Sequence, residues 1–267
     1  MPNSEFEKLV EIMSALRGEK GCPWDKEQTR ESLKPFLVEE TYEVLEAIDE
    51  RNPEKIKEEL GDLLFQIVFH CQLAKERHEF DINDVIRKIS EKMTGRHPHV
   101  FGEAQYETSE EVLRQWEERK KEEGKGRESI LEGIPKELPS LLRAHRIQAR
   151  AARVGFDWAR VEDVLKKLDE ELGEFRKALE KKDQEETEDE LGDVFFVLVN
   201  ISRFVSVNPE DALRKTISKF ISRFRYIEMK ASESGRVLSE MSLEEMDALW
   251  NEAKGKGQVP RNIARTP

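Results

Sequence analysis

Two groups of acidic residues in this chain have a composition and spacing that suit chemistry. Glu39-Glu40-x-x-Glu43 is followed by the E-L-G-D motif of residues 59–62, which supplies Glu59 and Asp62. Residues three apart on a helix share one face, so each motif presents a pair of carboxylates. Four carboxylates held close together repel one another and stay ionised only when cations neutralise them. Because oxygen ligands select hard cations, and Mg²⁺ binds readily together with phosphates, the motifs predict a phosphate site that depends on Mg²⁺ or Mn²⁺.

The same acids recur in the second half of the chain, 131 residues further on. Glu170-Glu171-x-x-Glu174 repeats the first motif, and the E-L-G-D of residues 190–193 repeats the second. Later matches have small shifts: they pair Lys92, Arg96, Trp116 and Lys120 with Lys219, Arg223, Trp250 and Lys254. Glutamates on helices usually form a solvated face. Two copies of one unit that keep the same polar residues instead favour a metal site of the same kind in each half.

The elements that position these acids are predicted to be helices. Apolar residues recur three and four apart, and no stretch alternates with a period of two, so the fold class is all-α. A helix capped by Thr29 is expected to run to about Arg51, and Asn52-Pro53 starts the next one. In the second half, helices are expected over 160–182 and 185–205. Further helices are expected before Gly18, after Asp81, over 139–154 and 209–232, and after the capping box at Ser242, with loops at 21–25 and 97–99.

Each pair of helices should form an antiparallel hairpin. The midpoint between Glu43 and Glu59 is Arg51, and the midpoint between Glu174 and Glu190 is Lys182. A turn at either midpoint brings the two acids level, roughly 12 Å from the turn at 1.5 Å per residue. Gly61 and Gly192 lie inside these helices, where glycine costs ~1 kcal/mol relative to alanine, so another backbone is expected to approach them closely.

Glycines and prolines divide the chain into two helical domains, residues 1–122 and 139–267, joined by a linker over 123–138. The net charge of −12 argues against a nucleic-acid polymer or an anionic membrane surface as a partner. No signal peptide or membrane span is apparent, and the two cysteines, Cys22 and Cys71, fit a reducing cytoplasm. The chain has no P-loop motif, and none of its histidines follows a glutamate by three residues, which makes a di-iron carboxylate bundle a poor candidate.

These motifs resemble those of the MazG-type nucleoside triphosphate pyrophosphohydrolases, which are relatives of the dimeric dUTPases. The resemblance extends over nearly the whole chain and includes the segments FLVEETYE at 36–43, RHPHVF at 96–101 and RVGFDW at 153–158. It implies tandem units of the four-helix-bundle type, completed by homodimerisation. It also implies hydrolysis of nucleoside triphosphates to monophosphate and pyrophosphate with Mg²⁺, for which Mn²⁺ could substitute.

The resemblance assigns metal ligation to four acids in each half of the chain, which are Glu171, Glu174, Glu190 and Asp193, and Glu40, Glu43, Glu59 and Asp62. We interpret the preceding residues, Glu170 and Glu39, as bases that orient a water molecule. Lys219 and Arg223 lie four apart and can hold phosphate oxygens, while Trp250 could stack on a base with Lys254 near the phosphates. Lys92, Arg96, Trp116 and Lys120 are the N-terminal counterparts, although His97-Pro98 interrupts the helix in that half.

Other functions stay open from the sequence. A non-enzymatic helical adaptor could use the acidic faces to dock a basic partner, and a hydrolase could act on inorganic pyrophosphate or on a modified nucleotide. For the nucleotide hydrolase, control or sanitation of nucleotide pools is the expected role. Base and sugar preference, and whether one half or both are active, do not follow from the residues.

Overall fold

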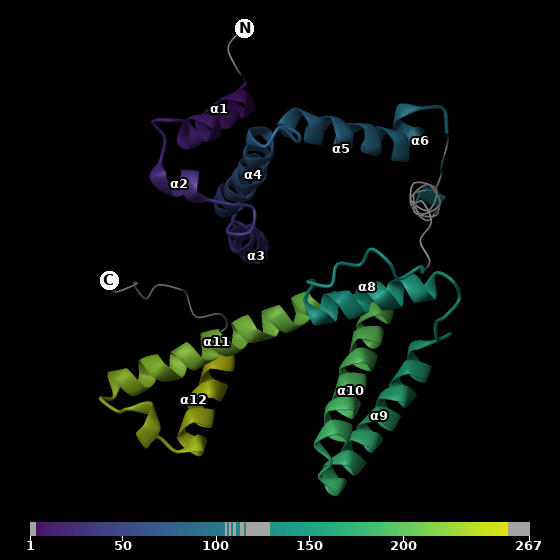
Figure 1. The fold of residues 1–267 in the computed structure, drawn as a ribbon. Helices are drawn as coiled ribbons and strands as arrows, with labels where there is room; N and C mark the ends of the chain where they lie inside the picture. Colours follow the sequence, from purple (N-terminus) through teal and green to yellow (C-terminus); the bar gives the residue numbers. More distant parts are fainter. Residues whose placement is uncertain are drawn as a thin grey trace. The chain divides into compact units, whose positions relative to one another are not determined.

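The computed structural model describes residues 4–104, 106, 108, 111, 112, 115 and 129–255, so two predicted site residues, Trp116 and Lys120, lie outside the described part. The chain divides into two compact units, Met1–Lys125 and Gly126–Pro267. Every regular element within the described ranges is a helix, which agrees with the all-α prediction (Figure 1). None of the helices in these ranges has the length and apolar character that crossing a membrane requires.

The N-terminal unit contains α1 (Glu5–Arg17), α2 (Pro23–Glu27), α3 (Lys34–Glu50), α4 (Pro53–Glu76), α5 (Ile82–Arg96) and α6 (Pro98–Phe101). The predicted caps hold at two of these helices. The Asn52 side chain accepts hydrogen bonds from two backbone N–H groups of α4, and Asp81 forms a capping box with Asp84 at the start of α5. Side chains that satisfy the free N–H groups of the first turn fix where these helices begin.

Three local predictions in this unit were wrong. Thr29 does not cap α3; its hydroxyl accepts a hydrogen bond from the backbone of Ser32 in a separate turn, and α3 begins only at Lys34. The expected loops at 21–25 and 97–99 contain the short helices α2 and α6. In both, proline occupies the first helical position, where its fixed φ and missing N–H suit a helix start.

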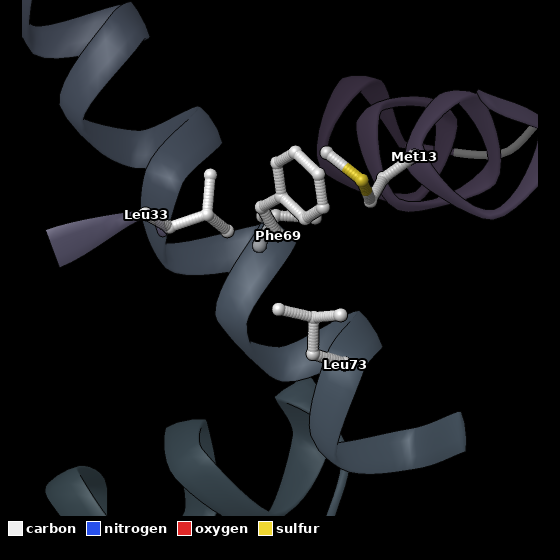
Figure 2. Close-up of a cluster of buried hydrophobic side chains, with 5 residues drawn as sticks. Met13, Leu33, Phe69 and Leu73 are labelled. Atoms are coloured by element: carbon white, nitrogen blue, oxygen red, sulfur yellow. The ribbon is translucent and has the colours of Figure 1, made fainter. Parts of the chain in front are cut away.

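A small apolar core joins α1 to the α3–α4 hairpin. Met13 from α1, Leu33 just before α3, and Phe69 and Leu73 from α4 point toward one another (Figure 2). Arg17 at the end of α1 also pairs with Glu76 at the end of α4, with 2.7 Å between nitrogen and oxygen. Together these contacts hold α4 in place.

The C-terminal unit contains α8 (Ser140–Ala152), α9 (Val161–Lys181), α10 (Gln184–Phe204), α11 (Pro209–Glu233), the 3-10 turn η1 (Leu238–Glu240) and α12 (Leu243–Gly255). Helix α10 packs against α9 and α8, and α11 packs against α8 and α12 (Figure 1). Asn208 caps α11 and Ser242 forms the expected capping box of α12 with Glu245. In the predicted linker, residues 129–138 form turns, and the Arg150 side chain donates a hydrogen bond to the Ile130 carbonyl at 3.0 Å.

The two hairpins, α3–α4 and α9–α10, repeat one design. Both turn at the predicted midpoint, where Arg51 and Lys182 adopt left-handed backbone conformations with φ of 54° and 58°. Ala47 and Ala178, which occupy equivalent positions, are fully buried where the helices of each hairpin meet. An ion pair lies beside each turn with its charges exchanged: Lys55 pairs with Glu50 in the first hairpin, and Lys181 with Glu186 in the second.

Candidate functional site

The α9–α10 hairpin brings three carboxylates together. Glu171 and Glu174 lie one turn apart on α9, and Glu190 faces them from α10. One carboxylate oxygen from each residue lies within 4.8 Å of the others. Glu171 is buried, with 5% of its surface exposed, so its charge lies partly out of solvent. These three residues are called the C-terminal cluster below.

The α3–α4 hairpin forms the equivalent group. Glu40 and Glu43 on α3 meet Glu59 on α4, again with one carboxylate oxygen from each within 4.8 Å of the others. This N-terminal cluster is more open, since Glu43 is exposed. The turn at each predicted midpoint is what makes the acids level, so the hairpin argument from the sequence holds in both halves.

The fourth predicted acid of each half lies outside its cluster. Neither Asp62 nor Asp193 belongs to the groups whose oxygens lie within 4.8 Å, and both residues are exposed. An aspartate side chain is one methylene shorter than a glutamate side chain, so it reaches less far from the helix. Both aspartates still act on their neighbours electrostatically, because Asp62 raises the pKa of Glu40 and Asp193 raises the pKa of Glu190.

Repulsion among the acids shows in their ionisation. Desolvation, followed by the negative charges of Glu174 and Glu171, raises the pKa of Glu190 above its ordinary value. In the other half, desolvation is again the largest cause and raises the pKa of both Glu40 and Glu59. Carboxylates that resist ionisation when crowded gain from a cation placed among them.

A lysine already touches the C-terminal cluster. Lys167, one turn before the acids on α9, places its ammonium 2.7 Å from a carboxylate oxygen of Glu171 and 2.7 Å from one of Glu170. The hydrogen bond to Glu170, followed by the hydrogen bond to Glu171, raises the pKa of Lys167. Sequence reasoning missed this residue, although its spacing of three and four to two glutamates is the usual signal for an ion pair on a helix.

The proposed bases lie beside the clusters and outside them. Glu39 and Glu170 are both exposed, and each directly precedes a buried or half-buried acid of its cluster on the same helix. Glu170 shares Lys167 with Glu171, so its carboxylate is held toward the C-terminal cluster.

The predicted phosphate and base contacts form a separate group on α11 and α12. The guanidinium carbon of Arg223 lies 5.4 Å from the centre of the Trp250 ring, and Phe220 contacts the same ring at 5.0 Å between centroids. Lys219 is exposed on α11, and Lys254 donates to the Asn251 side chain at 3.4 Å. Among the described residues, α11 contacts α12, α8 and α10, whereas neither α11 nor α12 packs extensively against α9, which carries two acids of the C-terminal cluster. In the other half, Lys92 is exposed on α5 whereas Arg96 is buried.

The two helical glycines meet no close neighbour within the described part of the chain. A Cβ atom added at Gly61 or at Gly192 would have nothing within 4 Å. Among the described residues of this chain, the predicted close approach of another backbone is therefore not found.

The donor set suits a hard divalent cation. Each cluster offers carboxylate oxygens alone, which is the chemistry that Mg²⁺ and Mn²⁺ prefer. The Lys167 ammonium shows that a positive charge is accommodated at Glu171. The residues present therefore fit a divalent cation in both halves.

The fold and the clusters define a class: an all-α protein with duplicated helical hairpins that gather carboxylates. The family model of the MazG nucleotide pyrophosphohydrolase domain matches twice, over residues 28–101 and 159–227, and each match contains one cluster. The chain belongs to the MazG family.

Relatives of this chain match it over nearly its whole length. It is 49% identical over 251 residues to the nucleoside triphosphate pyrophosphohydrolase/pyrophosphatase MazG of Thermotoga maritima, covering 94% of this chain and 96% of that protein. It is 44% identical over 258 residues to the nucleoside triphosphate pyrophosphohydrolase of Escherichia coli K12, covering 94% and 97%. The crystal structure of a mazG-related protein from Thermotoga maritima is 34% identical and covers 43% of this chain and 98% of that one, with a TM-score of 0.38.

Proposed function

We propose that this chain hydrolyses nucleoside triphosphates to the monophosphate and pyrophosphate, with Mg²⁺ as cofactor. The observation that carries the proposal is the duplicated cluster of three carboxylates in a chain whose relatives are named for this activity. A non-enzymatic adaptor gives no reason for three carboxylates from two helices to converge within 4.8 Å in both halves.

Acidic residues of α9 and α10 would bind the cation, and a residue of α9 would orient the water molecule. Glu171, Glu174 and Glu190 would hold the cation, with Asp193 one turn beyond Glu190 on α10 as the further predicted ligand. When bound, Mg²⁺ supplies neutralisation of the triphosphate charge and a more acidic water. Glu170 would orient the water molecule that attacks the α-phosphorus, and pyrophosphate leaves.

The basic group on α11 and α12 would complete the site from a second copy of the chain. Lys219 and Arg223 supply positive charge for phosphate oxygens, and the exposed part of the Trp250 ring offers a surface for the base. Within the described part of one chain, α11 and α12 do not pack extensively against α9, which carries Glu171 and Glu174. A homodimer that sets α11 of one subunit against the hairpin of the other would bring the basic residues and the acidic cluster together in one site.

Apolar surfaces next to the clusters support such a dimer. The helices α4 and α10 each leave three large side chains exposed in one row, at positions equivalent in the duplication: Leu60, Leu64 and Ile67, and Leu191, Phe195 and Leu198. Helix α11 exposes a similar row, formed by Leu213, Ile217, Phe220, Ile221 and Phe224. Rows with helical spacing that stay exposed in one chain are typical of helices that pack against a partner.

Single substitutions in each half test the proposal. Glu190→Gln and Glu59→Gln each remove one carboxylate and keep the side-chain shape. Loss of turnover in Glu190→Gln, with turnover kept in Glu59→Gln, would assign catalysis to the C-terminal cluster. Full activity in both variants would contradict the proposal.

Hydrolysis of inorganic pyrophosphate is a second candidate. The Thermotoga maritima relative is named as both a nucleoside triphosphate pyrophosphohydrolase and a pyrophosphatase. A carboxylate site that handles a triphosphate also suits the smaller pyrophosphate. Supplying pyrophosphate as the sole substrate and measuring released phosphate distinguishes the two activities.

Control or sanitation of the nucleotide pool is the role that we propose for the triphosphate activity.

A further inference from the structure

The two clusters differ at one position that touches the acids. Lys167 in the C-terminal half corresponds to Phe36 in the N-terminal half, at the same offset of 131 residues that relates the acids. One cluster therefore has a lysine at this position, and the other has an aromatic ring.

The lysine makes direct contact with a residue that would bind the cation. Its ammonium lies 2.7 Å from an oxygen of Glu171, which is the most deeply buried acid of the C-terminal cluster. A divalent ion that uses this oxygen must displace the ammonium. Displacement gives up a charge-assisted hydrogen bond at a buried carboxylate, where such bonds are stronger than on the surface.

The N-terminal cluster has no such contact from the equivalent position. Phe36 packs edge-on against Trp24, with 5.8 Å between ring centroids, and against the apolar core around Met13. Glu40 instead lies beside its own cluster partner, Glu43, with one carboxylate oxygen of each within 4.8 Å of the other. A cation entering this cluster has no lysine to displace at that position.

We propose that Lys167 is an internal counter-cation of the C-terminal cluster, so that without nucleotide this cluster binds Mg²⁺ or Mn²⁺ more weakly than the N-terminal cluster does. Lys167 is a positioning residue that acts through Glu171. The consequence is that cation binding in the C-terminal half depends on the arrival of a nucleotide that carries the cation with it. This inference rests on the proposed metal site.

Mn²⁺ titration followed by calorimetry tests the proposal without any turnover. Glu59→Gln leaves the C-terminal cluster intact, and Lys167→Met is added to that background. Lys166→Met is the matched control, because Lys166 is the adjacent residue of α9 and pairs with Asp163 instead of a cluster acid. Heat from scattered surface acids is subtracted with the double variant Glu59→Gln/Glu190→Gln.

Lys167→Met is expected to tighten Mn²⁺ binding about tenfold, or ~1.4 kcal/mol, whereas Lys166→Met changes it by less than about threefold. Lys167→Arg keeps the charge and should keep the weak binding. Glu190→Gln, which leaves only the N-terminal cluster, should bind Mn²⁺ more tightly than Glu59→Gln. Circular dichroism of every variant checks that the helices are retained.

Two results would overturn the inference, and they differ in what else they remove. Unchanged Mn²⁺ binding in Lys167→Met would show that the ammonium does not compete with the cation, and weakened binding would show that it favours cation binding by orienting Glu171. In both cases the metal site would stand. Absence of Mn²⁺ binding in Glu59→Gln/Lys167→Met would show that removing the ammonium does not free a cation site, and the inference would fail. Nucleotide turnover by Glu59→Gln with Mn²⁺ would then decide whether the proposed function fails with it.

Discussion

The proposed dimer makes a prediction whose size follows from the exposed row on α10. Phe195 is 52% exposed in one chain, and complete burial of such a side chain contributes about 1.5–3 kcal/mol. About half of that, roughly 0.8–1.5 kcal/mol, remains to be gained on association. A symmetric dimer buries the residue twice, so Phe195→Ser should weaken dimerisation by about 1.5–3 kcal/mol, or roughly 10- to 150-fold in Kd.

Sedimentation equilibrium over a range of concentrations measures this change. Leu243→Ser is the control, because Leu243 is more exposed than Phe195 but begins α12 outside the rows. Leu64→Ser makes the equivalent change in the N-terminal half and reports which hairpin carries the interface. A wild-type chain that stays monomeric would contradict the proposed dimer. A Phe195→Ser chain that dimerises as tightly as the wild type would contradict an interface through the exposed row of α10.

Three further predictions concern the stability of the C-terminal hairpin. The pKa of Glu190 is raised in the folded protein. Its favourable contribution to the free energy of unfolding is therefore complete below the unperturbed pKa of 4.5 and is lost as the pH rises through the raised pKa. In EDTA, Glu190→Gln should therefore melt at a higher temperature than the wild type above pH 5 and converge with it in acid, while Glu188→Gln, at an exposed position of α10, should show no such trend. Asp183 accepts two backbone N–H hydrogen bonds at 3.1 Å, so Asp183→Ala should lower the unfolding free energy in urea by ~1 kcal/mol, and an unchanged midpoint would contradict the cap. Mg²⁺ at about 100 times the Kd of the C-terminal cluster should stabilise Glu59→Gln by ~2.7 kcal/mol in thermal melts. It should stabilise Glu59→Gln/Glu190→Gln by less, and EDTA should reverse the effect.

Most of the fold could be predicted because local signals and hydrophobic spacing agree. Asn52-Pro53 and Asn208-Pro209 each combine a capping side chain with a proline at the first helical position, and both start helices where expected. Thr29 misled because a threonine hydroxyl can equally close a turn, and here it accepts from Ser32. The short helix α6 was missed because Pro98 ends one helix and starts another within two residues.

The candidate site could be predicted as far as helix geometry determines it. The spacing between Glu174 and Glu190 places them level across a hairpin, which the structure shows. The spacing does not tell how far the shorter aspartate side chain reaches. Asp193 lies outside the three-residue group, and its part in cation binding stays a prediction. The spacing also did not give the surroundings of Gly192, where a Cβ atom would have no neighbour within 4 Å among the described residues.

Analysis of reaction products shows which phosphate bond this chain cleaves. The purified chain is incubated with each common nucleoside triphosphate, with and without Mg²⁺, and the products are separated by anion exchange. We predict monophosphate and pyrophosphate in equal amounts. Both products should form only with the metal, and Glu190→Gln should form neither. Diphosphate and phosphate as the products, or turnover that continues in EDTA, would contradict this prediction.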